Sequence, residues 1–437
     1  MINKKLLIVL IGAFLIRLVG INQSLWLDEA TTAKAVSQYS FAEILTKFSP
    51  ADFHPPLYNI FMKLWTYTFG FSEIAIRLPS VLFSLLAGVA VFYLGGIWAS
   101  TLFLFNPLIV YYSQEARMYM MAVFFLVCAL YYFIRMTGSR TKSTMTKDFM
   151  LFNVFCILSF ATFYGSVFLI SAFYAFLLFR KRYSALIKSA LMLLVSIILL
   201  SPLLIRQVMN SRQALSLIPN WNLALGKVTI KNLILIPMKF SVGRISFEPK
   251  ILYYTLAAAF SLFVFYFVFK RGLKHKKYLF LLAVPIVIGT IFSLYSPLLQ
   301  YFRFLYLIPL MAIILGKSDK PKYANYIIFA GFLFFSAAYL LIPGFHREDW
   351  KSLAGSLPKN IPVYMIIPSS DPLKHYRPDI KISELRNSIP TEKEIIVIPY
   401  ASEIYGYDYS SLLKTDYYIN RKKSFRNLQY EVWKKMF

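Results

Sequence analysis

The chain has 437 residues, of which 58% are hydrophobic and 18% aromatic, and its mean hydropathy is +0.58. A soluble globular protein is excluded, because so apolar a chain could not cover itself with a polar surface. The formal net charge of +27 would fit a nucleic-acid-binding protein, but the chain has no groove-like basic and aromatic pattern outside its apolar runs, so we expect no nucleic-acid partner. The only cysteines, Cys128 and Cys156, lie inside apolar runs and define neither a disulfide framework nor a metal site.

Eleven apolar runs are predicted to cross a membrane as helices, which makes the fold class an α-helical polytopic membrane protein. They lie near residues 5–22, 78–94, 96–113, 118–135, 149–164, 165–180, 184–204, 251–270, 278–296, 301–316 and 323–343. Several approach the roughly 20 residues that a helix needs to span the hydrocarbon core. The first run resembles a signal peptide but lacks a small-residue cleavage site, so we interpret it as an uncleaved helix. The glycine pair Gly95-Gly96 predicts a tight hairpin between the second and third runs.

The loop charges predict the orientation of the chain. If the N-terminus is cytoplasmic, the turns on the same side should be basic. They contain Lys4, Lys5, Arg135, Arg140, Lys142, Lys147, Arg180, Lys181, Arg182, Lys188, Lys270, Arg271, Lys274, Lys276, Lys277, Lys317, Lys320 and Lys322. We therefore expect a multi-pass protein of the cell (inner or plasma) membrane with a cytoplasmic N-terminus and an extracytoplasmic C-terminal region.

Two domains are expected: a transmembrane domain over residues 1–343 and a small extracytoplasmic α/β domain over 344–437. The external loop 22–77 of the first domain shows helical periodicity, which predicts short amphipathic helices on the outer leaflet. In the second domain, residues 362–368 and 394–400 read as short buried strands. A helix is expected after the sequence HREDW, and another over 428–437.

The external loop begins with an adjacent acidic pair, Asp28 and Glu29, at the edge of the membrane. Carboxylates are costly there, so they are the first candidates for a functional site. Adjacent residues on a helix point about 100° apart, so one can act as a general base while the other positions a hydroxyl, a cation or an arginine. The alternative is that Asp28 caps the N-terminus of an interfacial helix.

Further polar candidates lie at the same predicted side. His54, in DFHPPLYN with Asp52, is either a ligand or hydrogen-bonding group of the site or a loop residue packed beside two prolines. Arg117, in SQEARMY with Glu115 and Tyr119, has a guanidinium that matches phosphate oxygens. Its alternative is a structural pair with Glu115.

Two other arginines carry open interpretations. Arg303, at the opening of the tenth apolar run, is either a phosphate ligand or an interface arginine. Arg17 lies inside the first run, where a charge is costly unless it snorkels or pairs within the bundle.

Several segments together resemble the polyprenyl-phosphate-sugar-dependent transferases of the GT-C superfamily. They are SLWLDEA, DFHPPLYN, GFSEIAIRLPS and YYSQEARMY, after a first span that carries an arginine, with QYFRFLYLIP and HREDW nearer the C-terminus. The pattern is similar to that of bacterial and archaeal members related to protein O-mannosyltransferases and the lipid A aminoarabinose transferase.

The resemblance implies roles for individual residues. The acidic pair would be catalytic, with Asp28 as the base and Glu29 as its neighbour in the site. The HPPLY segment would place His54 and Tyr58 near the reacting groups. The SQEARMY segment, with Glu115, Arg117 and Tyr119, would lie near the donor, and Arg117 and Arg303 would contact its phosphate. No convincing set of metal ligands is visible, so the resemblance names no cofactor and leaves a divalent metal open.

The implied function is that of a glycosyltransferase. It would move a sugar from a polyprenyl-phosphate-linked donor to a lipid, glycan or protein acceptor on the extracytoplasmic face, by a single inverting displacement. The alternatives are a transporter or flippase for a lipid-linked sugar, and a glycan ligase or polymerase that uses a lipid-diphosphate donor. A transporter would show paired repeats and polar residues near the midplane, whereas this chain keeps its polar residues in outer loops. The sugar, the acceptor, the metal dependence and the oligomeric state stay open.

Overall fold

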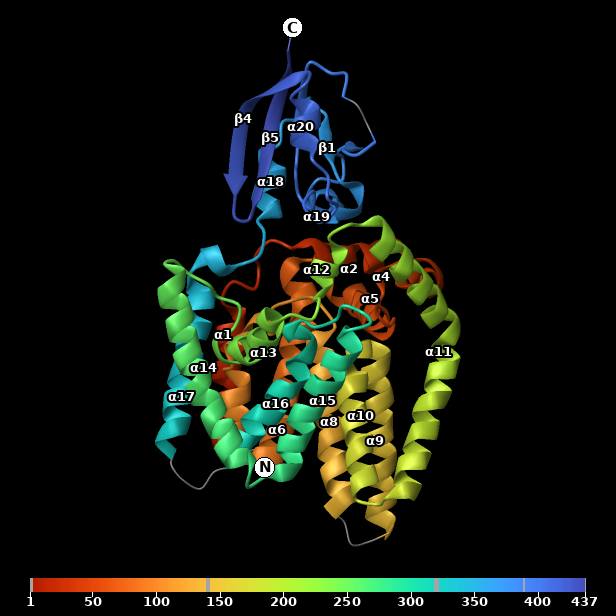
Figure 1. The fold of residues 1–437 in the computed structure, drawn as a ribbon, viewed down its shortest axis with the longest axis vertical. Helices are drawn as coiled ribbons and strands as arrows, with labels where there is room; N and C mark the ends of the chain where they lie inside the picture. The colour runs from red at the N-terminus through yellow and green to blue at the C-terminus, as the bar shows by residue number, and fades with distance from the viewer. Residues whose placement is uncertain (1–2, 139–141, 318–321, 388–389, 437) are drawn as a thin grey trace.

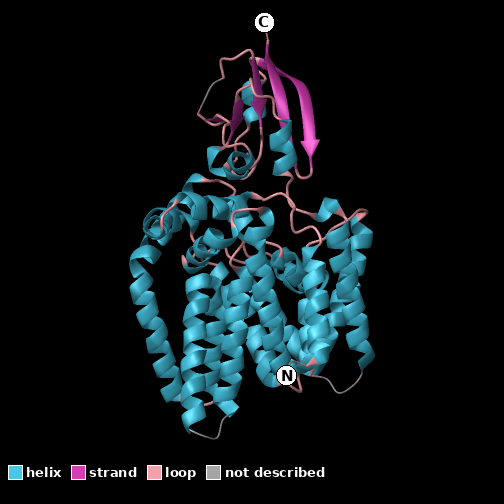
Figure 2. Ribbon diagram, turned by 180° about the vertical axis from the view of Figure 1, so that it is seen from behind, coloured by secondary structure: helices cyan, strands magenta, loops and turns pink. Residues whose placement is uncertain are grey.

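The computed structural model describes residues 3–138, 142–317, 322–387 and 390–436. A bundle of long helices makes up most of the molecule, and a small α/β unit lies at one end of it (Figures 1 and 2). The N-terminus lies at the opposite end of the bundle from the C-terminus (Figure 1). The predicted fold class, helical with a small C-terminal α/β unit, is therefore confirmed.

Every apolar run found in the sequence coincides with helical structure. The helices that correspond to these runs are α1 (Lys4–Leu18), α6 (Glu73–Leu104), α8 (Tyr119–Gly138), α9 (Lys142–Thr162), α10 (Val167–Phe179), α11 (Tyr183–Leu217), α14 (Lys250–Gly272), α15 (Lys276–Ser293), α16 (Ile308–Gly316) and α17 (Lys322–Leu341). Within the described residues, seven helices are long and apolar enough to cross a membrane. Because α1, α10 and α16 are shorter, the count of eleven spans stays a prediction.

Helix α6 is interrupted by the predicted hairpin. Gly96 has φ 77° and ψ −171°, a conformation that breaks the helix and favours glycine. After Gly96 the chain folds back on itself. The Ser100 hydroxyl donates a hydrogen bond to the Gly88 carbonyl at 2.9 Å, which joins the two arms of the hairpin. A Cβ on Gly88 would lie 2.6 Å from Leu104, so the two arms pack closely. The hairpin between the second and third apolar runs is confirmed.

Short helices form the layer between the bundle and the α/β unit (Figure 1). They are α2 (Leu27–Gln38), α3 (Phe41–Glu43), η1 (Ile44–Phe48), α4 (Ser49–Asp52), α5 (Leu57–Phe69), α7 (Pro107–Ser113), η2 (Tyr164–Ser166), α12 (Trp221–Leu225), α13 (Ile230–Val242), η3 (Tyr301–Leu307) and η4 (Pro343–Phe345). Helix α2 buries Ala30, Ala33 and Val36, the residues whose spacing predicts it. The candidate residues lie in this layer or at its border.

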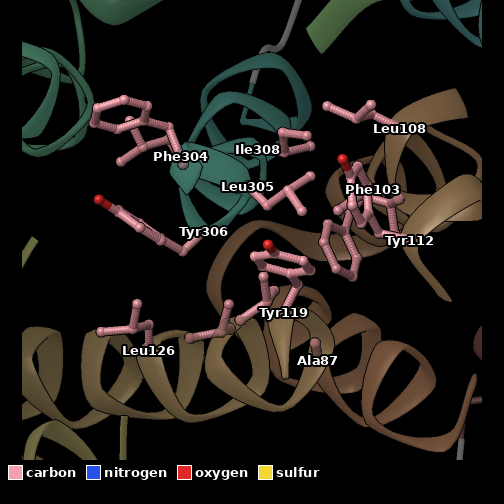
Figure 3. Close-up of a cluster of buried hydrophobic side chains, with 14 of the residues drawn as sticks. Ala87, Phe103, Leu108, Tyr112, Tyr119, Leu126, Phe304, Leu305, Tyr306 and Ile308 are labelled. Atoms are coloured by element: carbon pink, nitrogen blue, oxygen red, sulfur yellow. The ribbon is translucent and has the colours of Figure 1, made fainter. Parts of the chain in front are cut away.

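The core beneath this layer is aromatic and joins the N-terminal and later helices. Figure 3 shows Tyr112 and Tyr119 beside Phe304, Leu305 and Tyr306. The Tyr119 ring lies 5.3 Å from that of Tyr112 and 5.6 Å from that of Phe302. Between helices in lipid such packing acts through van der Waals contact rather than the hydrophobic effect. It fixes the start of α8 against η3.

The C-terminal unit is built on a five-stranded sheet with the order β2-β1-β3-β5-β4. Its elements are α18 (Trp350–Ser356), β1 (Val363–Met365), η5 (Ile367–Ser369), α19 (Asp371–Tyr376), β2 (Ile382–Glu384), β3 (Glu394–Val397), α20 (Tyr409–Leu413), β4 (Tyr417–Phe425) and β5 (Leu428–Lys435). Strands β2, β1 and β3 are parallel, while β5 is antiparallel to both β3 and β4. Strands β1 and β3 and helix α18 are where the sequence predicts them.

The predicted C-terminal helix is wrong, because residues 428–435 form strand β5. Leu428, Tyr430 and Val432 alternate along the chain and pack with Trp350 on one face of the sheet, which is the period-two pattern of a strand. Asn427 adopts a left-handed φ of 57° in the turn before it, which joins β4 and β5 into a hairpin.

Candidate active site

Glu29 is fully engaged inside the protein. Its Oε1 accepts hydrogen bonds from Arg77 Nε and from the Ala116 backbone N–H, both at 2.8 Å, and its Oε2 accepts from Arg77 Nη2 at 2.5 Å. The side chains of Glu29 and Arg77 are each 1% exposed. Both oxygens of the Glu29 carboxylate are therefore used within the protein, and its predicted part in a reaction stays a prediction.

Arg77 ties this corner to the start of the external loop. Its remaining hydrogen bonds go to the backbone carbonyls of Ile21, Gln23 and Ser24, at 2.8, 2.6 and 3.1 Å. A buried guanidinium with all its donors used is satisfied despite its burial. The arrangement fixes the chain just before α2, and therefore fixes the position of Asp28.

Asp28 faces the other way. It lies in the first turn of α2, the N-cap of which is Trp26 without a side-chain capping bond, so the N-cap interpretation of Asp28 is wrong. Its side chain is 39% exposed, and its Oδ2 lies 3.8 Å from Arg117 Nη2. Among the acidic candidates, Asp28 is the accessible one.

Arg117 is surrounded by acidic groups. Its side chain is 5% exposed, Nη1 makes a long contact of 3.5 Å with the Thr32 hydroxyl, and Nε has no hydrogen-bond partner. Burial lowers its pKa, but the charges of Asp28 and Asp52 outweigh that effect and raise the pKa of Arg117 overall. The guanidinium is therefore permanently charged and retains a free donor.

The Asp52–His54 segment lies on the far side of Arg117. His54 Nδ1 lies 2.7 Å from the Asp52 carbonyl and 3.4 Å from its carboxylate. Burial alone would raise the pKa of Asp52, but the charges of His54 and Arg117 lower it overall. Phe53 between them has a φ of 60°, a strained conformation for an aromatic residue, and strained residues cluster at functional sites. The His54 carbonyl accepts from Gln207 of α11 at 2.9 Å, which secures the loop.

Glu115 pairs with an arginine that the sequence did not single out. Its Oε1 accepts from Arg347 Nη2 at 2.8 Å, while its Oε2 has no partner. Burial raises the pKa of Glu115 above its usual range, and the Arg347 charge opposes this only in part. In the structure Glu115 therefore pairs with Arg347 of the C-terminal region, and the alternative in which Glu115 pairs with Arg117 is wrong.

A small cavity, with room for about one water molecule, lies beside this pair. It is lined by Gln23, Glu29, Arg77, Tyr111, Gln114, Glu115, Tyr339 and Arg347. The amide oxygens of Gln23 and Gln114 have no hydrogen-bond partner. Every lining residue carries a polar group, so a water molecule in the cavity would find hydrogen-bond partners.

Arg303 and Arg244 approach the site from the later helices. One guanidinium nitrogen of Arg303, Nη1, is buried without a partner, and the charges of Arg303 and Arg117 both act on the Tyr119 hydroxyl. Arg244 donates to the Tyr111 hydroxyl at 3.0 Å and lies 5.0 Å from the centre of that ring. Within the described residues, neither of these arginines forms an ion pair with a carboxylate.

Tyr58 is buried near Arg117, whereas Arg17 is buried within the helix bundle. The Tyr58 hydroxyl has no hydrogen-bond partner, and burial raises its pKa despite the nearby charge of Arg117. Arg17 donates to the Ser84 hydroxyl at 3.0 Å and to the carbonyls of Ala13 and Leu104 at 2.7 and 2.8 Å. Arg17 therefore pairs within the bundle, with hydroxyl and backbone oxygens, and clamps α1 onto the hairpin of α6.

The structure thus places Asp28, Glu115, Arg117, Tyr119 and Arg303 close enough for their charges to act on one another, with His54 linked to Arg117 through Asp52. Sequence reasoning missed Arg77, Arg244 and Arg347. Arg77 and Arg347 lie in the quoted segments GFSEIAIRLPS and HREDW, so the resemblance of those segments was the available signal. Over the described residues, no group of three histidine, cysteine, aspartate or glutamate side chains could hold a metal ion.

Comparisons with known proteins bear on the fold of the chain. Residues 53–205 match the dolichyl-phosphate-mannose-protein mannosyltransferase family. Two crystal structures of ArnT from Cupriavidus metallidurans, in the apo state and bound to undecaprenyl phosphate, match with TM-scores of 0.57 and 0.58 at 10% and 11% identity. Each match covers 98% of this chain and 97% of ArnT. A comparison with curated protein sequences finds no match. The chain is therefore a multi-span membrane protein with the GT-C fold.

Proposed function

We propose that the protein is a membrane glycosyltransferase that takes its sugar from a polyprenyl-phosphate-linked donor. The family matched over residues 53–205 is named for a dolichyl-phosphate-linked mannose donor, and ArnT, which shares the fold over nearly its whole length, binds undecaprenyl phosphate. Both facts point to the same donor chemistry: a sugar phosphate on a long polyprenyl chain.

The exposure of Asp28 is the observation that carries the proposal. It is 39% exposed, whereas Glu29 is locked to Arg77 and Glu115 is paired with Arg347. Asp28 takes the proton of an acceptor hydroxyl, and the oxygen attacks the anomeric carbon while the bond to the lipid phosphate breaks. One such displacement inverts the anomeric configuration. A positioned base contributes about 10²–10⁴-fold to the rate.

Arginines supply the countercharge for the leaving phosphate. Arg303 has an unpaired buried nitrogen and Arg117 an unpaired Nε, so both retain donors for phosphate oxygens. Negative charge grows on the phosphate as the bond breaks, and preoriented donors stabilise that transition state. Because Arg117 also lies 3.8 Å from Asp28, it connects the base to the phosphate side. Arg244 is a third cation of this set, and within the described residues it forms no ion pair with a carboxylate.

The reaction is proposed for the extracytoplasmic face of the cell membrane, with the N-terminus in the cytoplasm. The basic loops support this orientation. A single cysteine at Lys359, an exposed position of the C-terminal unit, should react with an impermeant maleimide added to intact cells. Reaction only after permeabilisation would reverse the orientation.

The donor is identified by incubating the purified protein with a panel of polyprenyl-phosphate sugars and lipid-diphosphate sugars. Consumption of a polyprenyl-phosphate sugar, with an inverted anomeric centre in the product, is the expected result. Consumption of lipid-diphosphate sugars alone would indicate a ligase or polymerase. If the protein consumes neither class yet moves a lipid-linked sugar across vesicles, it is a transporter.

A further inference from the structure

Two residues of the C-terminal region, Glu348 and Tyr400, lie beside the start of helix α2, and we call them the wall of the site. Tyr400 follows strand β3, and its hydroxyl makes a long hydrogen bond of 3.5 Å to Glu348 Oε1. Glu348 directly follows Arg347, whose guanidinium stacks on Trp26 two residues before Asp28, so Glu348 and Tyr400 lie close to the start of α2. Neither Glu348 nor Tyr400 has a role in the reaction described above.

Several polar atoms along this wall lack partners. Glu348 Oε2 is buried without a hydrogen bond, and so are the indole N–H groups of Trp26 and Trp350. Trp350 is fully buried, and its ring lies 4.9 Å from that of Tyr400. Buried polar groups are nearly always hydrogen-bonded, so the unpaired Glu348 Oε2 and Trp26 N–H, both near Asp28, indicate a ligand.

The wall is held rigidly. The Arg347 guanidinium stacks on Trp26 at 3.8 Å and pairs with Glu115, which ties the HREDW segment to the outer layer of the bundle. Ala401, directly after Tyr400, has a φ of 67°, and a non-glycine residue keeps such a conformation only when its surroundings impose it. The side chains of Glu348 and Tyr400 are therefore held in position before any ligand binds.

The set of groups defines the ligand. A carboxylate oxygen accepts from hydroxyls, while indole N–H groups donate to them. Burial and the charges of Glu348 and Asp28 raise the pKa of Tyr400, so its hydroxyl stays protonated and also donates. A sugar ring offers several adjacent hydroxyls that both donate and accept, whereas a serine or threonine side chain offers one.

We propose that Glu348 and Tyr400, with Trp26, form the acceptor subsite and bind the hydroxyl groups of a sugar ring next to Asp28. This assignment rests on the proposed function for the identity of the bound group as an acceptor. The acceptor is then a glycan or glycolipid rather than a protein side chain, and the C-terminal unit supplies part of the active site.

The test measures binding without turnover. The full-length protein in lipid nanodiscs is titrated with methyl glycosides of glucose, galactose and mannose, and with a serine-containing tripeptide, by saturation-transfer NMR. Wild type should bind at least one glycoside and not the peptide. Glu348→Gln and Tyr400→Phe should each weaken that binding by about tenfold, as expected for one lost hydrogen bond to a charged or buried group.

A matched control lies in the same unit. Tyr364 donates to Glu392 at 3.1 Å, and it belongs to the core on the opposite face of the sheet from Trp350. Tyr364→Phe and Glu392→Gln make the same chemical changes away from the site and should leave glycoside binding at the wild-type level. Thermal unfolding of all four variants checks that they fold.

Three outcomes would overturn the assignment: no glycoside binds to wild type, the Glu348 and Tyr400 variants bind as wild type does, or the tripeptide is the ligand lost in Glu348→Gln. The proposed function fails separately. If glycoside binding depends on Glu348 but wild type consumes no polyprenyl-phosphate sugar, the subsite stands and the glycosyltransferase does not. If the donor is consumed and the variants keep the wild-type acceptor KM, the subsite alone is wrong.

Discussion

The two sides of helix α2 differ in how their charges are used. On one side, Glu29 and Arg77 are each 1% exposed and satisfy each other and the neighbouring backbone. On the other, Asp28 is 39% exposed, its contact with Arg117 is 3.8 Å long, and Arg303 has a nitrogen with no partner. Two neighbouring residues of one helix thus belong, one to a buried ion pair and the other to a partly exposed set of charges.

The difference shows how the carboxylate proposed as the base can be held in place while its oxygens stay accessible. Neighbouring helical residues point about 100° apart, so one side chain can be buried while the next stays open. Glu29 and Arg77 spend their hydrogen bonds on fixing the start of α2. Asp28 lies in the first turn of α2 and is held in place with it, while its carboxylate stays accessible to a substrate.

The largest expected effect comes from breaking the closed pair. Glu29→Gln or Arg77→Met leaves one buried charge without its partner, which costs about 3–5 kcal/mol of folding free energy. Thermal unfolding in detergent should show a much lower midpoint for each single variant. The double variant Glu29→Gln/Arg77→Met removes both charges and should recover part of the loss. Single variants as stable as wild type would mean that the pair does not support the site.

On the open side, Arg303→Ala should act on the donor. Losing one charged hydrogen bond to phosphate costs about 1.5–3 kcal/mol, so donor binding should weaken about 10–100-fold while the protein stays folded. Binding of polyprenyl phosphate to the reconstituted protein measures this. The control is Arg206→Ala, an exposed arginine on α11. Equal affinity in wild type and Arg303→Ala would remove Arg303 from the phosphate site.

The smallest expected effect concerns pH. Despite its burial, the carboxyl of Asp52 has a pKa lowered by His54 and Arg117. The ionised form is therefore favoured by folding, and this contribution to stability is present above the usual pKa of an aspartate and lost as the pH falls through the lowered value. In the wild type, the unfolding midpoint should therefore fall as the pH drops below about 4. Asp52→Asn should make this fall smaller. Parallel pH profiles of wild type and Asp52→Asn would contradict this account.

Much of the fold follows from local sequence patterns. The apolar runs became helices because a chain in lipid must satisfy its backbone internally, and Gly95-Gly96 became a hairpin because Gly96 adopts a left-handed φ. The error over residues 428–435 arose because alternation over eight residues is weak until a partner strand such as β4 pairs with it.

The site was predicted less completely, for a physical reason. Asp28 and Arg117 were candidates by residue type and by the expected side of the membrane. The residues next to them, Glu29 and Glu115, are taken up by partners far away in the sequence. Arg77 is 48 residues from Glu29, and Arg347 is 232 residues from Glu115. No local pattern encodes such pairs. From the sequence we therefore placed Asp28 and Glu29 in one site, as a base and its neighbour. Only the fold shows that their environments differ.

The most direct test of this separation is Asp28→Asn, assayed with the polyprenyl-phosphate sugar that wild type consumes. Because Asp28 is partly exposed and lies outside the closed pair, the variant should unfold at the wild-type temperature. Its turnover should fall by about 10²–10⁴-fold, the contribution of one general base. A folded Asp28→Asn protein that turns over at the wild-type rate would contradict the central claim.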